Sequence, residues 1–319
     1  MGVSLRQIVP IEKVELNDIR NKIIAMDANN HLYQFLSAIR TPKGDSIKDS
    51  KGRIVSHLLG LFPRTVNLMK NDIKVVYAFD GEPPKLKEME LEKRRERKRI
   101  SKKEYEIAKK KGKVEDMRKF AARISRLTSE MIEESRRLLE LLGVPYVQSP
   151  MEADAQIAHM VKEGKCYAVS TQDYDPLLHG ADRLVRRISK ATRGKGPVEM
   201  IVLQKLLDKW EITQEELIFL AMTKGTDYNP EGIKGVGFKT GLKLLRKKSL
   251  EEIFQELKPD FNWKKILELY QEMEIKDDYS LEWKSPNKEG IRKFLIDEHD
   301  FSEKRVENRL KEIGDWNGK

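Results

Sequence analysis

The sequence predicts an α/β protein with a mostly parallel central sheet flanked by helices. Three observations support this fold class. Short apolar stretches typical of buried strands alternate with longer segments of helical periodicity. Acidic residues follow four of these stretches, at the position where sites form in open parallel sheets. The chain has 319 residues, which is enough for one large domain of this kind.

Five short apolar segments are predicted to be strands. Helical patterns separate them, as parallel strands joined by helical crossovers require. The segments are 22–26 (KIIAM), 74–79 (KVVYAF), 144–148 (VPYVQ), 167–170 (YAVS) and 184–188 (LVRRI).

Several helices are predicted from their periodicity and their capping residues. One runs from Phe120 to Leu142, with apolar residues at helical spacing and Gly143 as its C-cap. The others are predicted from capping boxes, a glycine-rich loop and the periodicity of the tail. They begin at Thr213-x-x-Glu216, after the loop 225–237, at Ser249-x-x-Glu252 and at about residue 301.

The charged residues are numerous and unevenly distributed. They make up 36% of the chain, and the net charge of +10 favours a polyanionic partner. Residues 85–103 hold ten basic and four acidic side chains but few apolar ones. We therefore expect 82–116 to be a projecting insertion that is mobile or ordered by its substrate. No apolar run is long enough for a membrane span, and the single cysteine, Cys166, indicates a reducing intracellular compartment.

Acidic side chains are expected to gather at one edge of the predicted sheet. The carboxyl ends of parallel strands meet at that edge, and two of the strands are followed by carboxylates at i, i+2 spacing. A further aspartate occurs in the glycine-rich loop. The seven residues are Asp27, Asp80, Glu152, Asp154, Asp173, Asp175 and Asp227.

Such a cluster of carboxylates needs cations to remain ionised. Two unit charges 4 Å apart repel by about 1 kcal/mol in water and by roughly 4 kcal/mol at a partly buried site. Oxygen ligands favour Mg²⁺ or Mn²⁺, and two such ions about 4 Å apart commonly serve phosphodiester hydrolysis. The alternative is that each residue simply caps a helix, which explains one strand end better than four. The five histidines are scattered along the sequence, so no zinc site is expected.

Basic and aromatic residues suggest how a nucleic acid would bind. Lys87, Arg94 and Lys98 have the spacing of one helical face that could meet a phosphate, although a solvated charged helix is the alternative. Tyr33 could stack on a base, or it could pack in the core.

The segment 232–245 (GIKGVGFKTGLKLL) offers backbone N–H groups and a helix N-terminus to a phosphate. An ordinary helix–turn–helix without a ligand is the alternative. The residues expected to contact such a phosphate are Lys234, Gly235, Gly237, Lys239 and Lys243.

Several long motifs occur in an order that resembles archaeal-type flap endonucleases, which are structure-specific 5′ nucleases. The resemblance runs from Met1 to about residue 312. The motifs are MGV, MDANNHLYQFL (26–36), SHLLG (56–60), FDGEPPKLK (79–87), GVPYVQSPMEADAQIA (143–158), TQDYDPLL (171–178) and KGTDYNPEGIKGVG (224–237).

The resemblance implies hydrolysis of branched DNA at the junction between duplex and 5′ flap, with 5′–3′ exonuclease activity, in replication and repair. It implies two Mg²⁺ ions, replaceable by Mn²⁺, held by the seven carboxylates. Asp80, Asp154 and Asp175 would act directly in catalysis, with Lys87 and Arg94 on the scissile phosphate.

The resemblance also implies how the chain is organised as a single nuclease domain, 1–319. Residues 82–125 would form a helical arch for the free 5′ end, and Tyr33 would stack near the terminal nucleotide. Arg40 and Lys311 would lie near a pocket for a 3′ flap, and the N-terminus at Gly2 would lie near the site. The expected regions are 1–98 (N-terminal nuclease), 82–125 (arch), 126–224 (intermediate nuclease), 225–250 (helix–turn–helix duplex-binding element) and 251–319 (C-terminal helical).

The implied partners and cofactors follow the family. The protein would be a monomer that binds branched DNA in the nucleoid of an archaeal cytoplasm. A K⁺ ion would bind at the helix–turn–helix loop, where Glu231 is one residue more than the family pattern has. A sliding clamp is a family partner, although the usual C-terminal box for it is absent from the ending IGDWNGK.

Two rival functions remain open. A sister 5′ exonuclease or junction nuclease would share the carboxylates but differ in substrate, and the continuous arch favours flap processing instead. A non-catalytic protein that binds branched DNA would not need divalent metal, so metal titration separates it from a nuclease.

Overall fold

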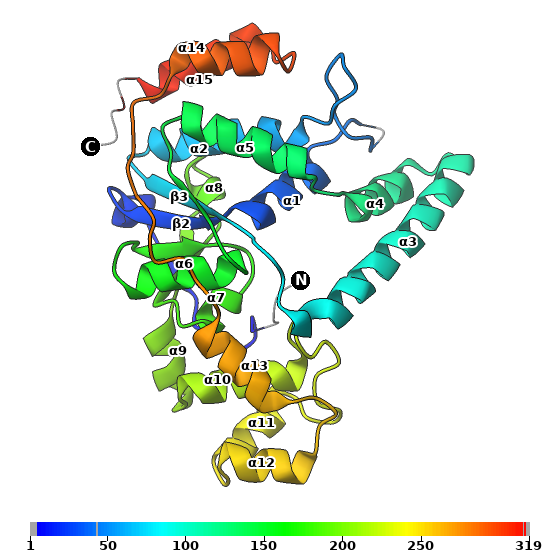
Figure 1. The fold of residues 1–319 in the computed structure, drawn as a ribbon, viewed down its shortest axis with the longest axis vertical. Coiled ribbons are helices and arrows are strands. Elements are labelled where there is room, and N and C mark those ends of the chain that lie inside the picture. The colour runs from blue at the N-terminus through cyan, green and yellow to red at the C-terminus, as the bar shows by residue number, and fades with distance from the viewer. Residues whose placement is uncertain (1–4, 43, 315, 317–319) are drawn as a thin grey trace.

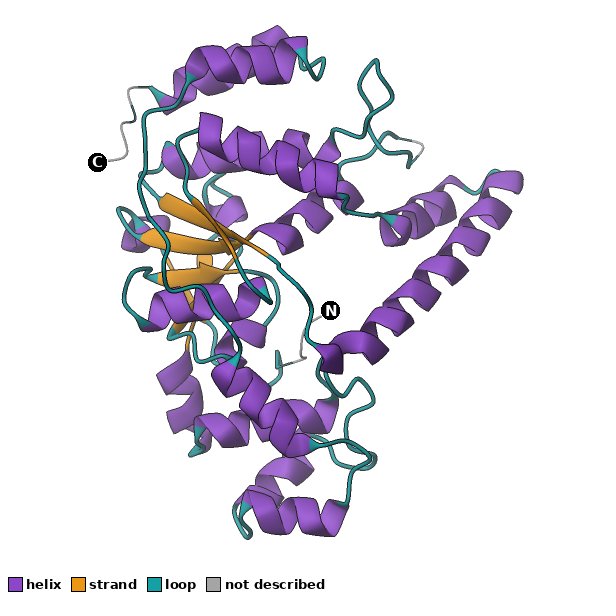
Figure 2. Cartoon of the chain, viewed as in Figure 1, coloured by secondary structure: helices purple, strands orange, loops and turns teal. Residues whose placement is uncertain are grey.

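The computed structural model describes residues 5–42, 44–314 and 316. Its centre is a seven-stranded sheet surrounded by helices, which confirms the predicted fold class (Figures 1 and 2). The strand order is β1-β7-β6-β5-β2-β3-β4. The strands are β1 Glu12–Val14, β2 Ile23–Asp27, β3 Lys74–Phe79, β4 Tyr146–Gln148, β5 Ala168–Ser170, β6 Arg183–Arg186 and β7 Val198–Val202.

The five predicted strands form the parallel part of the sheet. Neighbours β4, β3, β2, β5 and β6 all pair in parallel, and β3 has its predicted bounds. The prediction missed β7 and β1, which add to β6 as two antiparallel strands at one edge. Glu199 interrupts the apolar run of β7, and β1 is the three-residue segment EKV, so neither reads as a buried strand.

Helices cover both faces of the sheet. Helices α1 (Ala28–Ala38), α2 (Ser56–Met69) and α5 (Ser129–Leu141) lie on one face, and α6 (Ala153–Lys162) lies on the other (Figure 1). On the α1 side, Leu58 and Tyr77 are fully buried in the main core, and Ile157 is buried in a smaller core beneath α6. Helices α14 (Lys288–Arg292) and α15 (Glu303–Ile313), joined by the π-helical turn η3 (Lys293–Asp297), form an outer layer over α2 and α5.

A second group of helices extends the molecule beyond the sheet and has its own apolar core, which includes Phe219 and Phe254. Both predicted capping boxes are present, at Thr213 and at Ser249. A short helix, α8 (Ile188–Ala191), follows β6. The helices of the second group are α7 (Asp175–Leu178), α9 (Leu203–Trp210), α10 (Gln214–Lys224), α11 (Phe238–Leu245), α12 (Leu250–Leu257) and α13 (Trp263–Glu272).

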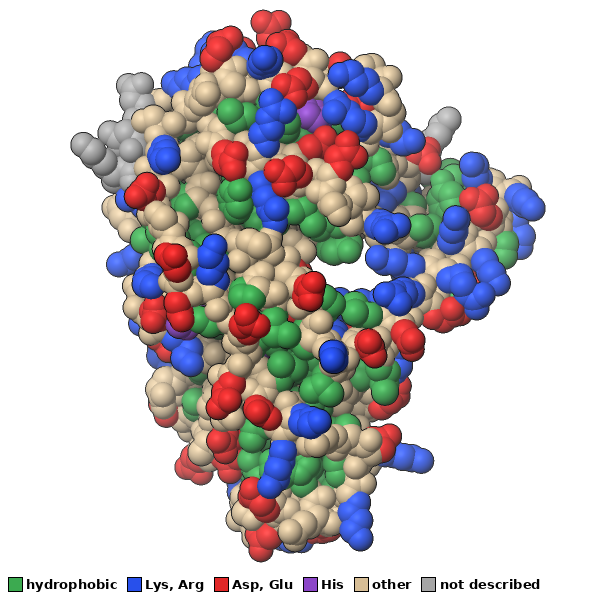
Figure 3. Space-filling model, viewed as in Figure 1, with side chains coloured by type: hydrophobic (Ala, Val, Ile, Leu, Met, Phe, Trp, Pro, Cys, Tyr) green, Lys and Arg blue, Asp and Glu red, His purple; other side chains and the backbone are tan. Residues whose placement is uncertain are grey.

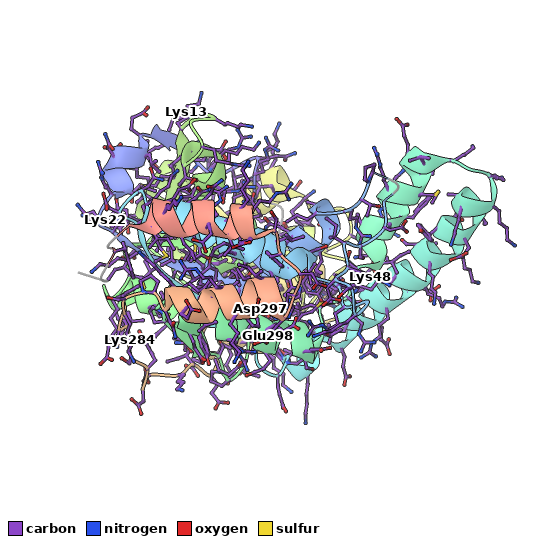
Figure 4. All side chains as sticks on the ribbon, turned by 90° about the horizontal axis from the view of Figure 1, so that it is seen from above. Lys13, Lys22, Lys48, Lys284, Asp297 and Glu298 are labelled. Carbon is purple, nitrogen blue, oxygen red and sulfur yellow. The ribbon has the colours of Figure 1, made fainter. Side chains whose placement is uncertain are left out.

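Helices α3 (Glu88–Lys110) and α4 (Val114–Ile124) form an arch that projects from the body, as Figures 1 and 4 show from two directions. They pack against each other, and an opening bordered by basic side chains of the arch separates them from the body (Figure 3). The prediction of one helix from Phe120 to Leu142 was wrong. The chain leaves the helix after Ile124, and the Thr128 hydroxyl starts α5 by accepting the Met131 N–H at 3.3 Å.

The fold brings together histidines that are far apart in the sequence. The Nε2 atoms of His57 and His299 each lie 2.9 Å from a different oxygen of Glu134. Burial would raise the pKa of Glu134, but these hydrogen bonds outweigh it and hold that pKa at about 2. Burial would likewise lower the pKa of His299, but Glu134 and the Phe294 carbonyl raise it above 6.5. The network joins α2, α5 and the turn before α15.

Within the described ranges, no helix is both long and apolar enough to cross a membrane.

Candidate active site

The structure places the predicted carboxylates at the carboxyl ends of the parallel strands. Asp27 is the last residue of β2, and Asp80 directly follows β3. The four carboxylates that follow β4 and β5 lie at or near the starts of helices. The seventh carboxylate comes from the turn after α10. These are Glu152 and Asp154 at the start of α6, Asp173 and Asp175 before and at the start of α7, and Asp227.

Asn30 holds two of these carboxylates in place. Its backbone N–H donates to Asp27 Oδ1 at 2.9 Å, and its side-chain Nδ2 donates to Asp173 Oδ2 at 2.7 Å. Gln34 Nε2 in turn donates to Asn30 Oδ1 at 2.5 Å. The sequence reasoning did not identify Asn30. Its position three residues after the capping Asp27 gives a signal for the backbone bond, but nothing local indicates the contact with Asp173.

Asp154 lies where the negative charges converge. Burial raises its pKa first, and the charges of Asp27, Asp175, Asp173 and Asp80 raise it further. Burial and the charge of Asp80 similarly raise the pKa of Asp27. Asp154 Oδ1 is buried and has no hydrogen-bond partner in the described part of the chain. A buried carboxylate oxygen without a donor, among other carboxylates, fits the oxygen ligand set of a hard divalent cation.

Two cations from the base of the arch reach the other carboxylates. Lys87 Nζ lies 2.6 Å from Glu152 Oε1 and 2.9 Å from Asp227 Oδ2. Arg94 Nη2 lies 2.7 Å from the same oxygen of Asp227. Burial would lower the pKa of Lys87, but the charges of Glu152 and Asp227 outweigh the effect of burial and raise this pKa. The ammonium therefore stays charged. The carboxylate edge and the arch are therefore joined by ion pairs.

The predicted common helical face of the basic residues needs a correction. Lys87 belongs to the 3-10 turn η2 (Lys85–Lys87) that precedes α3, because the chain turns at Pro83 and Pro84 before the helix begins. Arg94 and Lys98 do lie on α3. Lys87 contacts Asp227 from this turn, and Arg94 contacts the same carboxylate from α3. The two cations therefore approach Asp227 from different elements.

Tyr228 is a further residue of the site that sequence reasoning missed. Its hydroxyl donates to Glu152 Oε2 at 3.0 Å. Burial and then the charge of Glu152 raise the pKa of Tyr228 well above its ordinary value, so the hydroxyl keeps its proton and remains a donor. The residue follows Asp227 directly in the sequence, but no spacing rule indicates that it turns towards Glu152.

Tyr33 faces the arch rather than the core. Its side chain is 41% exposed, and Lys98 Nζ lies 5.5 Å from the centre of its ring. The core-packing alternative for Tyr33 is therefore wrong. Helix α1 thus presents an aromatic side chain beside a cation of α3.

The glycine-rich loop lies on the surface beside α11. Lys234, Lys239 and Lys243 are exposed. Gly235 has a φ of +79°, which favours glycine, and Gly237 is the N-cap of α11. A Cβ at either glycine would meet nothing within 4 Å, so this backbone is open to a ligand.

The residues expected near a 3′ flap lie apart from the carboxylates. Arg40 donates to the Gly44 carbonyl at 2.9 Å and to Ser125 Oγ at 2.5 Å, and Lys311 is exposed on α15. A cavity of about 670 Å³ lies between segments 47–63 and 299–312, but neither residue lines it. Gly2 lies outside the described residues.

One other group of described residues could hold a metal ion. His159, Glu163 and Asp277 place potential ligand atoms within 4.8 Å of one another. They lie at the opposite end of α6 from Glu152, and Glu163 also pairs with Lys165 at 2.8 Å. This surface group is separate from the carboxylate edge.

Comparisons with known proteins agree with this geometry. The XPG N-terminal domain matches residues 1–101 and the XPG I-region matches 143–227, and together these ranges contain all seven carboxylates. Flap endonuclease 1 of Pyrococcus furiosus is 46% identical over 322 aligned positions, which cover 98% of this chain and 95% of that protein. Flap endonuclease 1 of Staphylothermus marinus is 42% identical, with 98% and 94% covered.

Solved structures agree as well. Flap endonuclease-1 from Methanococcus jannaschii has a TM-score of 0.80 at 37% identity, with 98% of each chain covered. The catalytic core of Rad2, solved in complex with a DNA substrate, shares the fold with a TM-score of 0.75 at 23% identity, with 98% and 100% covered. The chain therefore belongs to the flap endonuclease 1 family of structure-specific 5′ nucleases.

Proposed function

We propose that this protein hydrolyses phosphodiesters at the junction between duplex and 5′ flap in branched DNA during replication and repair, with accompanying 5′–3′ exonuclease activity. One observation carries the proposal. Seven carboxylates gather at the edge of the sheet, and Lys87 and Arg94 from the base of the arch join them. A cationic opening beside an acidic cluster suits a DNA strand that must approach bound metal ions.

Divalent metal ions are required by nucleases of this family. We propose two Mg²⁺ ions, replaceable by Mn²⁺, and the unpartnered Asp154 Oδ1 supports this choice of hard cation. When bound, such ions activate water and stabilise charge on the phosphate. The residues that would hold them are Asp27, Asp80, Glu152, Asp154, Asp173, Asp175 and Asp227.

The chain's own side chains would position the substrate and the ligands. Lys87 and Arg94 would offset the negative charge of the scissile phosphate. Asn30 and Tyr228 would hold Asp173 and Glu152 through the hydrogen bonds described above. Tyr33, with Lys98 beside its ring, would stack on the terminal base of the cut strand.

Other parts of the molecule would hold the rest of the DNA. The arch over 82–125 would admit the free 5′ end through the opening in Figure 3. The loop before α11 would bind the duplex backbone through its exposed amides and Lys234, Lys239 and Lys243, with K⁺ at the same loop. Arg40 and Lys311 are proposed contacts of a 3′ flap. We propose that the protein acts as a monomer.

The test is cleavage of a 5′-labelled double-flap DNA in Mg²⁺ or EDTA, with blunt duplex and a four-way junction as control substrates. We expect one Mg²⁺-dependent product, cut one nucleotide into the downstream duplex. A ladder of mononucleotides, or a preference for the junction, would instead assign the protein to a sister nuclease class. Binding without cleavage in any divalent metal would contradict the proposal.

A further inference from the structure

The loop after α10 contacts the base of the arch through two carboxylates. Asp227 pairs with Lys87 at 2.9 Å and with Arg94 at 2.7 Å, as described above. The second carboxylate, Glu231, pairs with Lys93, the residue that precedes Arg94 on α3. In the described part of the chain, these three ion pairs join α3 and its preceding turn to the loop.

This loop, residues 225–232, has a backbone that is fixed by hydrogen bonds. Thr226 Oγ1 donates to Asn229 Oδ1 at 2.7 Å, and Asn229 Nδ2 donates to a carbonyl of α10 at 2.8 Å. The Gly232 N–H donates to the Asn229 carbonyl at 2.9 Å and closes the loop. The side chain of Glu231 is 75% exposed, so it extends from a fixed backbone towards α3 and is otherwise little covered.

Helix α3 has little else to fix its base. Only Glu90, Ser101 and Ala108 of its 23 residues are buried, so no large apolar side chain anchors the helix in a core. An element with so little buried apolar surface depends on polar contacts for its position and opens easily. The ion pairs with the loop therefore have a large part in setting where the base of the arch lies.

The two ion pairs of Asp227 conflict with its proposed role. Asp227 would hold a metal ion, and Lys87 and Arg94 would contact the scissile phosphate, so metal and DNA would draw these residues out of their pairs. Glu231 and Lys93 have no part in either set of contacts. The hydrogen bond and the charge of Lys93 lower the pKa of Glu231, so this carboxylate stays ionised at physiological pH. The pair of Glu231 and Lys93 is thus the one that can persist during cleavage.

We propose that Glu231 is a positioning residue for cleavage. Through Lys93 it holds the base of α3 against the loop while Asp227 holds metal and the two cations of the active site turn to the phosphate. The inference rests on the proposed function, and it gives Glu231 no contact with DNA or metal. Small misplacements of groups that contact a reacting phosphate slow the reaction. Loss of Glu231 should therefore slow the chemical step rather than weaken substrate binding.

Two neutral variants and a charge exchange test this role. Glu231→Gln and Lys93→Gln should each slow single-turnover cleavage of the double flap about fivefold, which is the upper range for an exposed ion pair. The Kd for flap DNA should change by less than about twofold. The double variant should be no slower than either single variant. Exchanging the charges, with Lys93→Glu and Glu231→Lys together, should restore most of the rate.

The matched control is Glu96→Gln. Glu96 is an exposed glutamate of the same helix, but it pairs with Arg99 of α3 at 2.8 Å and not with the loop, so its loss should leave the rate unchanged. If Lys93 merely attracted DNA and Glu231 merely repelled it, their variants would change DNA binding in opposite directions. Such opposite changes, or a Glu231→Gln rate equal to that of Glu96→Gln, would overturn the proposal.

Hydrogen exchange of the first turns of α3 tests the contact without DNA. In EDTA the ion pairs of Asp227 still hold the helix, so Glu231→Gln should raise exchange by less than about twofold. In Mg²⁺, where Asp227 turns to the metal, the same variant should raise exchange about fivefold. Glu96→Gln should show no such metal-dependent difference. Equal exchange of Glu231→Gln and the wild type in Mg²⁺ would contradict the positioning role.

The positioning role and the proposed function fail separately. Flap cleavage by the wild type, with Glu231→Gln indistinguishable from Glu96→Gln, would reject the positioning role and keep the function. A wild type that does not cleave flap DNA in Mg²⁺, but shows the metal-dependent exchange difference, would reject the function and keep the contact between the loop and α3.

Discussion

Replacing Lys87 with methionine removes the cation that lies between two carboxylates of the candidate active site. The ammonium is 2.6 Å from Glu152 and 2.9 Å from Asp227, and the side chain is only 14% exposed. A hydrogen bond between charged groups contributes about 1.5–3 kcal/mol, and breaking a buried ion pair costs about 3–5 kcal/mol. In EDTA we expect Lys87→Met to lower the free energy of unfolding by about 3 kcal/mol.

Divalent metal should reverse much of this loss. Lys87 and a metal ion would compete for the oxygens of Glu152 and Asp227. Without the lysine these carboxylates are available to the metal alone, so Lys87→Met should bind metal more tightly. We therefore expect Mg²⁺ to raise the melting temperature of Lys87→Met more than that of the wild type. Single-turnover cleavage should nevertheless fall by about 10²–10³-fold, because a cation positioned for the scissile phosphate is lost.

The matched control is Lys85→Met, which removes the same charge from the same turn but from an exposed side chain. Thermal unfolding in EDTA and in Mg²⁺, together with single-turnover cleavage of the labelled double flap, compares the two variants. If Lys87→Met and Lys85→Met behave alike in both assays, the ion pairs of Lys87 have neither the energetic nor the catalytic role assigned here.

Three further predictions follow from other contacts. Asp175→Asn should abolish cleavage but retain flap-DNA binding by anisotropy, and near wild-type turnover would contradict its role. The pKa of Glu134 is about 2 and that of His299 is raised above 6.5, so their pair should stabilise most between about pH 4.5 and 6.5. Denaturant unfolding should show stability falling below and above this range, and Glu134→Gln should flatten the profile. Gly60→Ala places a Cβ 2.1 Å from Phe35, so calorimetry should show a loss of about 1–3 kcal/mol, and no loss would mean that α1 and α2 adjust freely.

The strand-end carboxylates could be predicted because their placement follows from local rules. Asp27 and Asp80 come directly after apolar strands, and parallel strands must present their carboxyl ends at one edge. The glycine-rich loop and the capping boxes were equally local signals. The antiparallel strands β1 and β7 gave no such signal, since their charged residues hide the short apolar pattern.

The contacts that orient the carboxylates could not be predicted, because they join residues far apart in the chain. Asn30 meets Asp173, and Lys87 meets Glu152 and Asp227, only after the sheet and the arch have formed. A cavity of about 400 Å³ beside α1 is a stronger case, since its lining residues, among them His31, Gln34, Arg64, Arg186 and Glu199, come from six separate segments of the chain. No periodicity in one segment can reveal a set of side chains that only tertiary structure assembles.

Helix α1 shows how these distant elements are coordinated. Successive residues of a helix are rotated by 100°, so its first two turns point Asn30 at the carboxylates, Tyr33 at the arch, and His31 with Gln34 at the cavity. Its remaining face is buried through Leu32, Phe35 and Leu36. Because Gly60 lets α2 approach Phe35 closely, the packing of this one face sets the direction of the other three. A small rotation of α1 would therefore disturb Asp173, the stacking surface and the cavity together, which makes the α1–α2 contact as important for DNA cleavage as for stability.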